Sequence, residues 1–185
     1  MPETAQTSLR LFNQAIANER PPEDLQGLRD SYDLAMVLFR GLYRPSGKTF
    51  IAHLAGTCSL LLADDLPLPV LQAGILHAAY THGRFGGMAR WHLNRQRGEV
   101  RRVTSIEAEA LVHAYARLSW DEAAITRHTE SWEALGAADR NVVLIRLANE
   151  VDDHLDGGMR YAGKSKKYRF SENNLRAMER MAETA

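Results

Sequence analysis

The sequence lacks several features that define large classes of proteins. Cys58 is the only cysteine among the 185 residues, which excludes an intrachain disulfide and a cysteine-based zinc site. Neither charge is in excess, because Lys plus Arg and Asp plus Glu both number 23. We therefore expect neither nucleic acid nor a membrane as a partner. No apolar run is long enough for a bilayer, and MPETAQTSLRLF has no signal-peptide pattern, so we expect a cytoplasmic protein.

What the sequence has is helical periodicity along most of its length. Apolar residues recur every three or four positions in 8–19, 24–43, 50–62, 70–82, 104–118, 141–155 and 172–183, and no segment alternates like a strand. In the first segment this spacing selects Leu9, Phe12 and Ile16 as the buried face. Segment 70–82 is very apolar and 141–155 is strongly amphipathic, and we expect the two side by side at the centre. The pattern predicts a single all-α domain over residues 1–185.

Three sequence blocks carry the candidate chemistry. They read GLYRPSGKTFIAHLAGT from Gly41, AGILHAAYTHG from Ala73 and LIRLANEVDDHL from Leu144. In order and spacing they resemble the HD-superfamily metal phosphohydrolases, and especially the hydrolase domain of the stringent-response guanosine-tetraphosphate enzymes. There the blocks read R-x-S-G-x-x-[FY]-x-x-H, L-L-H-D-x-x-E-D and L-A-D-R-L-H-N. The resemblance implies an HD-like core at about residues 24–157, with a basic loop and a helix following at 158–185.

The same resemblance implies a divalent metal (Mn, Fe or Zn), held by His53, His77 and the residue at position 149. Such an ion polarises a phosphate ester and activates water. The acidic ligands of the family are replaced here by Ala78 and Asn149, and the acid pair by Thr81 and His82. We therefore do not expect guanosine-tetraphosphate hydrolysis at a useful rate.

A second resemblance fits the sequence better. An uncharacterised HD-like family has the motifs H-[LN]-x-G-T, L-[FL]-H-S-x-Y-G-T and L-A-N. The corresponding stretches here are HLAGT from His53, ILHAAYTH from Ile75 and LAN ending at Asn149. In this family Asn149 is a regular member of the site. The resemblance carries no known reaction.

Helix geometry suggests roles for the neighbouring residues. His82 lies one turn beyond Ala78, and Asp153 lies one turn beyond Asn149, so each is a candidate catalytic acid or base. Together with the metal-site residues they should surround one pocket. We expect its substrate-binding residues to include Tyr80 at the rim, Arg44 at the entrance and Lys48 nearby. The late helix should bury Leu144, Leu147 and Val151.

Each of these residues also has a purely structural interpretation. His77 can be a hydrogen-bonded core histidine, and His82 can favour a helix C-terminus through its charge. Asp152 and Asp153 can form a solvated face. The basic and aromatic segment MRYAGKSKKYRF at 159–170 can contact phosphate or single-stranded nucleic acid, or it can be a solvated loop.

Two functions of different classes remain open. One is a metal-dependent hydrolase, or a related enzyme, for a small phosphorylated or otherwise anionic metabolite. The other is a catalytically silent HD-like module for binding or assembly. Assembly as a homo-oligomer is compatible with either.

Overall fold

The computed structural model describes residues 4–86, 92–155 and 172–183, and in these ranges the chain is all-helical. An isolated bridge between Tyr43 and Thr49 is the only β pairing there, which confirms the predicted fold class. The helices are α1 (Ser8–Ala17), α2 (Pro22–Leu38), α3 (Phe50–Ala63), α4 (Leu68–Leu76), α5 (Ala79–His82), α6 (Leu93–Val103), α7 (Ile106–Tyr115), α8 (Glu122–Glu130), α9 (Ala137–Leu155) and α10 (Glu172–Glu183). The basic segment 159–170 lies outside the described residues.

Side-chain caps and prolines fix where many of the helices begin. The side chains of Thr7, Thr49, Ser105 and Asp121 each accept a hydrogen bond from a backbone N–H of the first turn that follows. Pro22 occupies the first turn of α2, where a proline costs no hydrogen bond. Because Thr49 caps α3, the position of His53 one turn later is fixed relative to the preceding loop.

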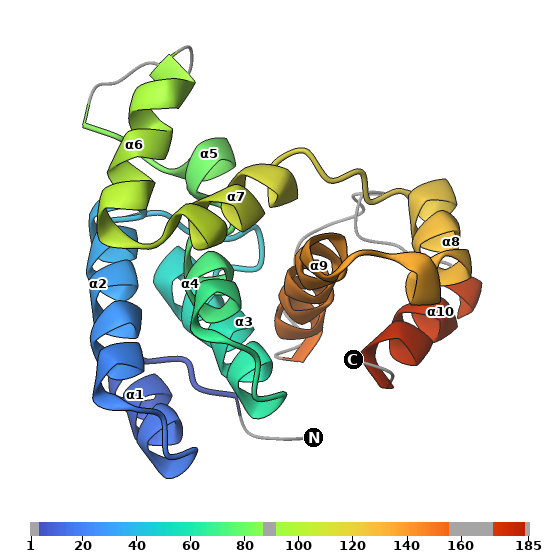
Figure 1. The fold of residues 1–185 in the computed structure, drawn as a ribbon, viewed down its shortest axis with the longest axis horizontal. Helices are drawn as coiled ribbons and strands as arrows, with labels where there is room; N and C mark the ends of the chain where they lie inside the picture. Colours follow the sequence, from blue (N-terminus) through green and yellow to red (C-terminus); the bar gives the residue numbers. More distant parts are fainter. Residues whose placement is uncertain (1–3, 87–91, 156–171, 184–185) are drawn as a thin grey trace.

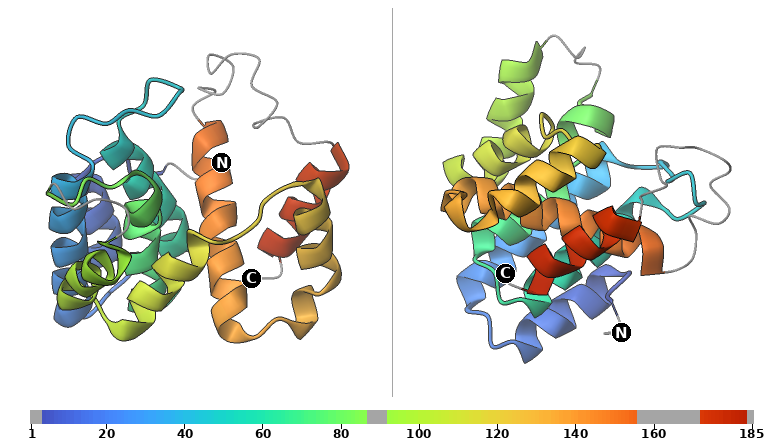
Figure 2. Two further views of the ribbon diagram at one scale, coloured as in Figure 1. Left: turned by 90° about the horizontal axis from the view of Figure 1, so that it is seen from above. Right: turned by 90° about the vertical axis from the view of Figure 1, so that its right-hand side faces the viewer.

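Helix α9 is central to the architecture. It lies between helices α1–α7 on one side and the pair α8 and α10 on the other (Figures 1 and 2). Its most extensive packing is with α3, whereas α4 packs mainly on α2, α3 and α7 and contacts α9 over a smaller area. The expectation that 70–82 and 141–155 pack side by side is therefore only partly met, because α3 is the main neighbour of both. Leu144 and Leu147 are buried as predicted, but Val151 is 41% exposed.

Two further details differ from the sequence-based expectation. In α1 the buried residues are Leu11 and Ala15, and Leu9 and Ile16 are 70% and 59% exposed. Both sets have helical spacing, so periodicity alone could not choose between the two faces. In addition, α2 ends at Leu38, and residues 39–49 form a loop instead of the last turns of a helix.

The expected continuous helix over 70–82 is wrong. α4 ends at Leu76, and after His77 and Ala78 the chain resumes as the single-turn helix α5. Ala78 has φ −91° and ψ 5°, outside helical geometry. At this point His77 Nδ1 contacts the Gly74 carbonyl oxygen at 2.8 Å, and such a side-chain bond competes with the backbone bonds of the helix. The break changes the direction in which His82 points.

None of the helices in the described ranges has the length and apolarity needed to cross a membrane.

Candidate functional site

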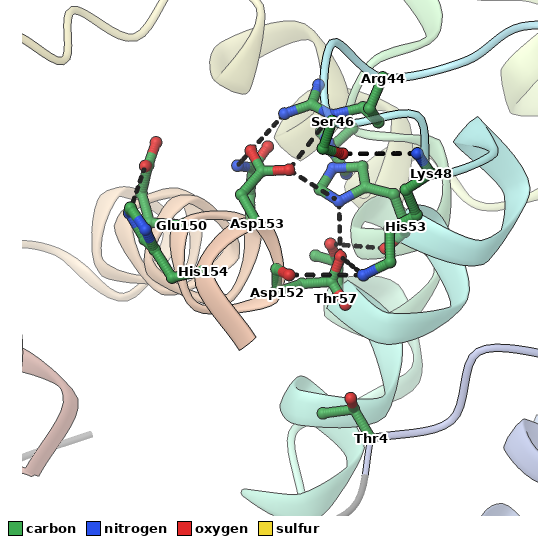
Figure 3. A network of polar contacts seen from close by, with 12 residues as sticks. Thr4, Arg44, Ser46, Lys48, His53, Thr57, Glu150, Asp152, Asp153 and His154 are labelled. Atoms are coloured by element: carbon green, nitrogen blue, oxygen red, sulfur yellow. Dashed lines mark hydrogen bonds and ion pairs between the residues drawn. The ribbon is translucent and has the colours of Figure 1, made fainter. Parts of the chain in front are cut away.

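A buried cluster of polar residues joins α3 to α9. His53, in the second turn of α3, directs Nδ1 toward Asp152 Oδ2 at 2.7 Å and toward Asp153 Oδ1 at 3.5 Å (Figure 3). His53 and Asp152 are fully buried, and Asp153 is nearly so. The interpretation of Asp152 and Asp153 as a solvated face is therefore wrong.

The rest of the HLAGT motif makes room for this contact. A Cβ on Gly56 would lie 1.8 Å from Asp152 Oδ1, so only glycine fits at this position. The Thr57 hydroxyl donates to the His53 carbonyl oxygen at 3.0 Å. Gln6 Nε2, from the segment before α1, donates to Asp152 Oδ1 at 3.0 Å. The motif thus provides both the imidazole and the space that its carboxylate partner needs.

The turn before α3 places two cations on the two carboxylates. Gly47 has a φ of +85°, which favours glycine, and the Arg44 N–H donates to the Lys48 carbonyl at 2.8 Å. Lys48 Nζ lies 2.9 Å from Asp152 Oδ2. Arg44 donates two hydrogen bonds to Asp153, one from Nε to Oδ1 at 3.2 Å and one from Nη2 to Oδ2. The RPSGK turn is therefore joined to α9 by two ion pairs (Figure 3).

Each carboxylate is paired with one of these cations, and the pKa of Asp152 shows how the surroundings act on it. Burial opposes ionisation of Asp152, but the hydrogen bonds and charges of His53 and Lys48 outweigh it, and the pKa of Asp152 is lowered. Because an ionised carboxylate only accepts, His53 Nδ1 is the donor in their contact. Two negative charges thus face two positive charges, and the group has no net formal charge apart from His53.

His77 lies next to His53 and is kept neutral. The centres of the two rings are 5.3 Å apart, and the Tyr115 ring lies 4.8 Å from His77. Burial, followed by repulsion from His53 and nearby arginines, lowers the pKa of His77 well below its usual value. Its Nδ1 faces a carbonyl oxygen and so carries the proton, which leaves a lone pair on Nε2. The Nε2 atoms of both His53 and His77 are buried without a hydrogen-bond partner among the described residues.

Asn149 forms hydrogen bonds to Tyr115 and Asp153. Its Oδ1 accepts from the Tyr115 hydroxyl at 2.9 Å, and its Nδ2 donates to Asp153 Oδ2 at 3.3 Å. Arg146 Nη1 donates to the same Tyr115 hydroxyl at 3.1 Å, and its other end pairs with Glu150. The Nε of Arg146 is buried and has no partner within the described part of the chain.

These side chains line a partly enclosed cavity of about 410 Å³. Its wall includes polar residues from all three sequence blocks, namely Arg44, His77, Thr81, His82, Arg146, Asn149 and Asp153. Tyr43, 64% exposed, also lines it. His82 also lines the cavity, and Thr81 Oγ1 lies 2.8 Å from its Nδ1. Hollows of about 600 Å³ beside Met36 and about 630 Å³ beside His113 are larger, but neither unites the three blocks.

The structure brings together most, but not all, of the predicted site residues. His77, Asn149, Arg44, His82 and Asp153 share the cavity wall, and His53 lies directly behind it.

Two substrate-binding predictions are not met in this geometry. The Tyr80 hydroxyl donates instead to buried Glu109 at 3.0 Å, where Arg97 and Arg101 also bind, and Tyr80 is not on the cavity wall. Lys48 binds Asp152 and does not line the cavity.

Sequence reasoning missed two residues and undervalued a third. The sequence singles out Asp153 as the candidate acid or base, but its neighbour Asp152 makes the closest contact with His53. Arg146 lies one turn before Glu150, a spacing that signals an ion pair but not its position at a cavity. Tyr115 was missed because nothing in the local sequence of α7 distinguishes it from a core tyrosine.

Fold and site together define an all-α protein with a buried His–Asp–Asp group beside a polar cavity. His53, Asp152 and Asp153 each offer a ligand atom within 4.8 Å of the others, so the group has donors suited to a metal ion. A family model described as a domain of unknown function, DUF6817, matches residues 41–119. This range contains the first two sequence blocks and ends before α9. A comparison with curated proteins found no match.

Proposed function

We propose that the protein is a divergent HD-like enzyme, a metal-dependent hydrolase or a close chemical relative, that acts on a small phosphorylated or otherwise anionic metabolite. The observation that carries the proposal is the pair of buried imidazoles beside a cavity. Both have Nδ1 held by an oxygen acceptor and Nε2 without a partner among the described residues. Metal-binding histidines have this arrangement, in which an oxygen behind the ring fixes the tautomer.

Two groups of donor atoms are available for a metal ion. The first consists of His53 Nδ1, Asp152 and Asp153, but Lys48 and Arg44 already neutralise its carboxylates. The second consists of the Nε2 atoms of His53 and His77, with Asn149 adjacent on the cavity wall. We favour the second group, because an orphaned buried acceptor requires a cation or a donor, whereas the first group is satisfied. Imidazole donors suit Zn and Fe better than they suit Mn.

Bound there, a divalent ion would supply a Lewis acid for a phosphoryl or carbonyl oxygen. The protein's own contribution would be to bind and orient the anion. Arg146 has a buried Nε–H without a partner among the described residues, and Arg44 lies on the same wall. A phosphate group satisfies such donors better than water does, because a charge-assisted hydrogen bond is stronger. Tyr43 and Phe50 offer apolar contacts to the remainder of the ligand.

Proton transfer falls to the residues at the break between α4 and α5. His82 lines the cavity in contact with the Thr81 hydroxyl, so it is placed to accept or donate a proton. Asp153 lies on the same wall but is held by Arg44. His82 is therefore the better candidate for the general base, and the role of Asp153 is to supply negative charge to the site.

Metal analysis of the purified protein combined with a screen of phosphorylated metabolites tests the proposal. We expect a stoichiometric divalent metal and release of phosphate from at least one metabolite. Both should be lost in His77→Gln and retained in His113→Gln, a histidine outside the cavity. A metal-free protein that turns over no compound, even after incubation with Zn²⁺, Fe²⁺ and Mn²⁺, would refute the enzyme.

The alternative is a catalytically silent HD-like module that binds an anion without metal. The observation that favours it is the internal neutralisation of Asp152 by Lys48 and of Asp153 by Arg44, which leaves little net negative charge to attract a divalent ion. Under this alternative His77→Gln would leave anion binding intact, and no metal would be found.

A further inference from the structure

The Arg44–Asp153 pair has a property that a purely structural ion pair would not need. Both side chains line the cavity, and they hold each other there through two hydrogen bonds. Arg44 is the cavity's natural anion contact, and Asp153 is the only carboxylate that the described residues place on its wall. Arg44 therefore occupies the carboxylate that a cation would need, and Asp153 occupies the guanidinium that an anion would need.

We propose that Arg44 changes partner from Asp153 to the anionic ligand, and that this exchange couples anion binding to cation binding. The inference rests on the proposed function, because it assumes that a divalent ion binds near His53. An anion that takes the guanidinium leaves Asp153 without its counter-charge. The freed carboxylate lies 3.5 Å from His53 Nδ1 and within reach of Asn149 Nδ2 at 3.3 Å, so its charge is added to the region of the metal donors.

The neighbouring contacts explain why this pair, rather than the other, would exchange. Lys48 and Asp152 do not line the cavity, and Asp152 has further bonds from Gln6 and His53. Asp152 thus stays fixed when a ligand enters. Arg44, in contrast, lies on a loop, and its guanidinium is 5.4 Å from the centre of the Phe50 ring, a flat surface along which it can turn.

The coupling follows from charge. With Arg44 on Asp153, the region around His53 is nearly neutral and attracts a divalent ion weakly. With Arg44 on an anion, the same region gains one uncompensated negative charge. By linkage, the cation must strengthen anion binding by the same factor. The protein would thereby hold cation and anion together and bind each poorly alone.

Titration with Mn²⁺, followed by the electron paramagnetic resonance signal of the free ion, measures the coupling directly. Inorganic phosphate serves as the anion. We expect phosphate to raise the Mn²⁺ affinity of the wild-type protein at least about fivefold, the lower end of typical couplings. In Arg44→Gln the Mn²⁺ affinity without phosphate should already be high, and phosphate should change it little. Arg40→Gln, an exposed arginine outside the cavity, is the matched control and should behave like the wild type.

Asp153→Asn provides a second route if Arg44→Gln folds poorly. This variant frees Arg44 permanently, so phosphate binding without metal, measured by calorimetry, should tighten and become independent of Mn²⁺. Circular dichroism checks the fold of each variant. Equal Mn²⁺ affinity with and without phosphate in the wild type, or coupling that persists in both variants, would overturn the exchange while leaving the proposed enzyme intact. Absence of Mn²⁺ binding in every protein and condition would overturn the exchange, whereas the proposed enzyme is tested separately by incubation with Zn²⁺ and Fe²⁺.

Discussion

Replacement of Gly56 by alanine tests the packing of the candidate site most directly. The added Cβ would lie 1.8 Å from Asp152 Oδ1 and 2.7 Å from Gln6 Nε2. No rotation relieves this contact cheaply, because Lys48, His53 and Gln6 all hold the same carboxylate. Either α3 moves away from α9, or Asp152 gives up at least one of its bonds.

The magnitude can be worked out from the parts. Overpacking of a buried site costs about 1–3 kcal/mol, and loss of one hydrogen bond to a charged group costs about 1.5–3 kcal/mol. Alanine regains about 1 kcal/mol of helix propensity relative to glycine. We therefore expect Gly56→Ala to lower the free energy of unfolding by roughly 2–5 kcal/mol, which corresponds to a fall in Tm of roughly 5–15 °C for a chain of this size.

Urea denaturation followed by tryptophan fluorescence measures the change, and Gly98→Ala is the matched control. Gly98 lies in the middle of α6, is exposed, and has no heavy atom within 4 Å of an added Cβ. That variant should gain roughly 0.5–1 kcal/mol. In a double-mutant cycle, Asp152→Ala should cost less in the Gly56→Ala background than in the wild type, because the clash has already weakened its contacts. A Gly56→Ala protein as stable as the wild type would refute the packing argument.

Three other predictions concern the remaining parts of the site. Tyr80→Phe should cost about 1 kcal/mol in thermal unfolding but leave phosphate binding unchanged, since its hydroxyl bonds Glu109 outside the cavity; weaker phosphate binding would restore Tyr80 to the ligand contacts. The purified protein should not release pyrophosphate from guanosine tetraphosphate, because Ala78 and Asn149 lack the acidic groups of the HD site; hydrolysis that disappears in His77→Ala would contradict this. Because the pKa of Asp152 is lowered in the folded protein, its ionised form contributes stability above pH 3.8, and this contribution is lost as the pH falls through the lower folded-state pKa. The free energy of unfolding of Asp152→Asn, measured against pH, should therefore fall less steeply in acid than that of the wild type.

The helical fold was predictable because periodicity is a local property of the chain. α3 and α9 were evident from their apolar spacing; α3 forms where expected, whereas α9 begins at Ala137, ahead of the expected segment 141–155. The break after Leu76 was not evident, because it coincides with a bond between the His77 ring and the Gly74 carbonyl, and periodicity does not register such a bond. The apolar run simply continues through the break, so the sequence predicts one helix where there are two.

The site was predictable only as far as family-like spacing extends. His53 and His77 were recognisable from their blocks, and the structure places them next to each other. The residues that the RPSGK turn binds were not recognisable, because Arg44 and Asp153 are 109 positions apart. The sequence around Asp153 also does not distinguish a buried, paired aspartate from one exposed to solvent. Burial decides whether Asp152 and Asp153 are solvated or paired, and burial depends on how α3 and α9 meet.

The packing of α3 against α9 also has a consequence for where this protein can be divided. The matched range 41–119 holds His53 and the two cations of the site, Arg44 and Lys48, whereas Asp152 and Asp153 lie outside it. A fragment that ended near residue 119 would leave Arg44 and Lys48 without the carboxylates that they bind, and it would expose the side of α3 that packs on α9. We therefore expect that a fragment of residues 41–119 does not fold by itself and that α9 is needed.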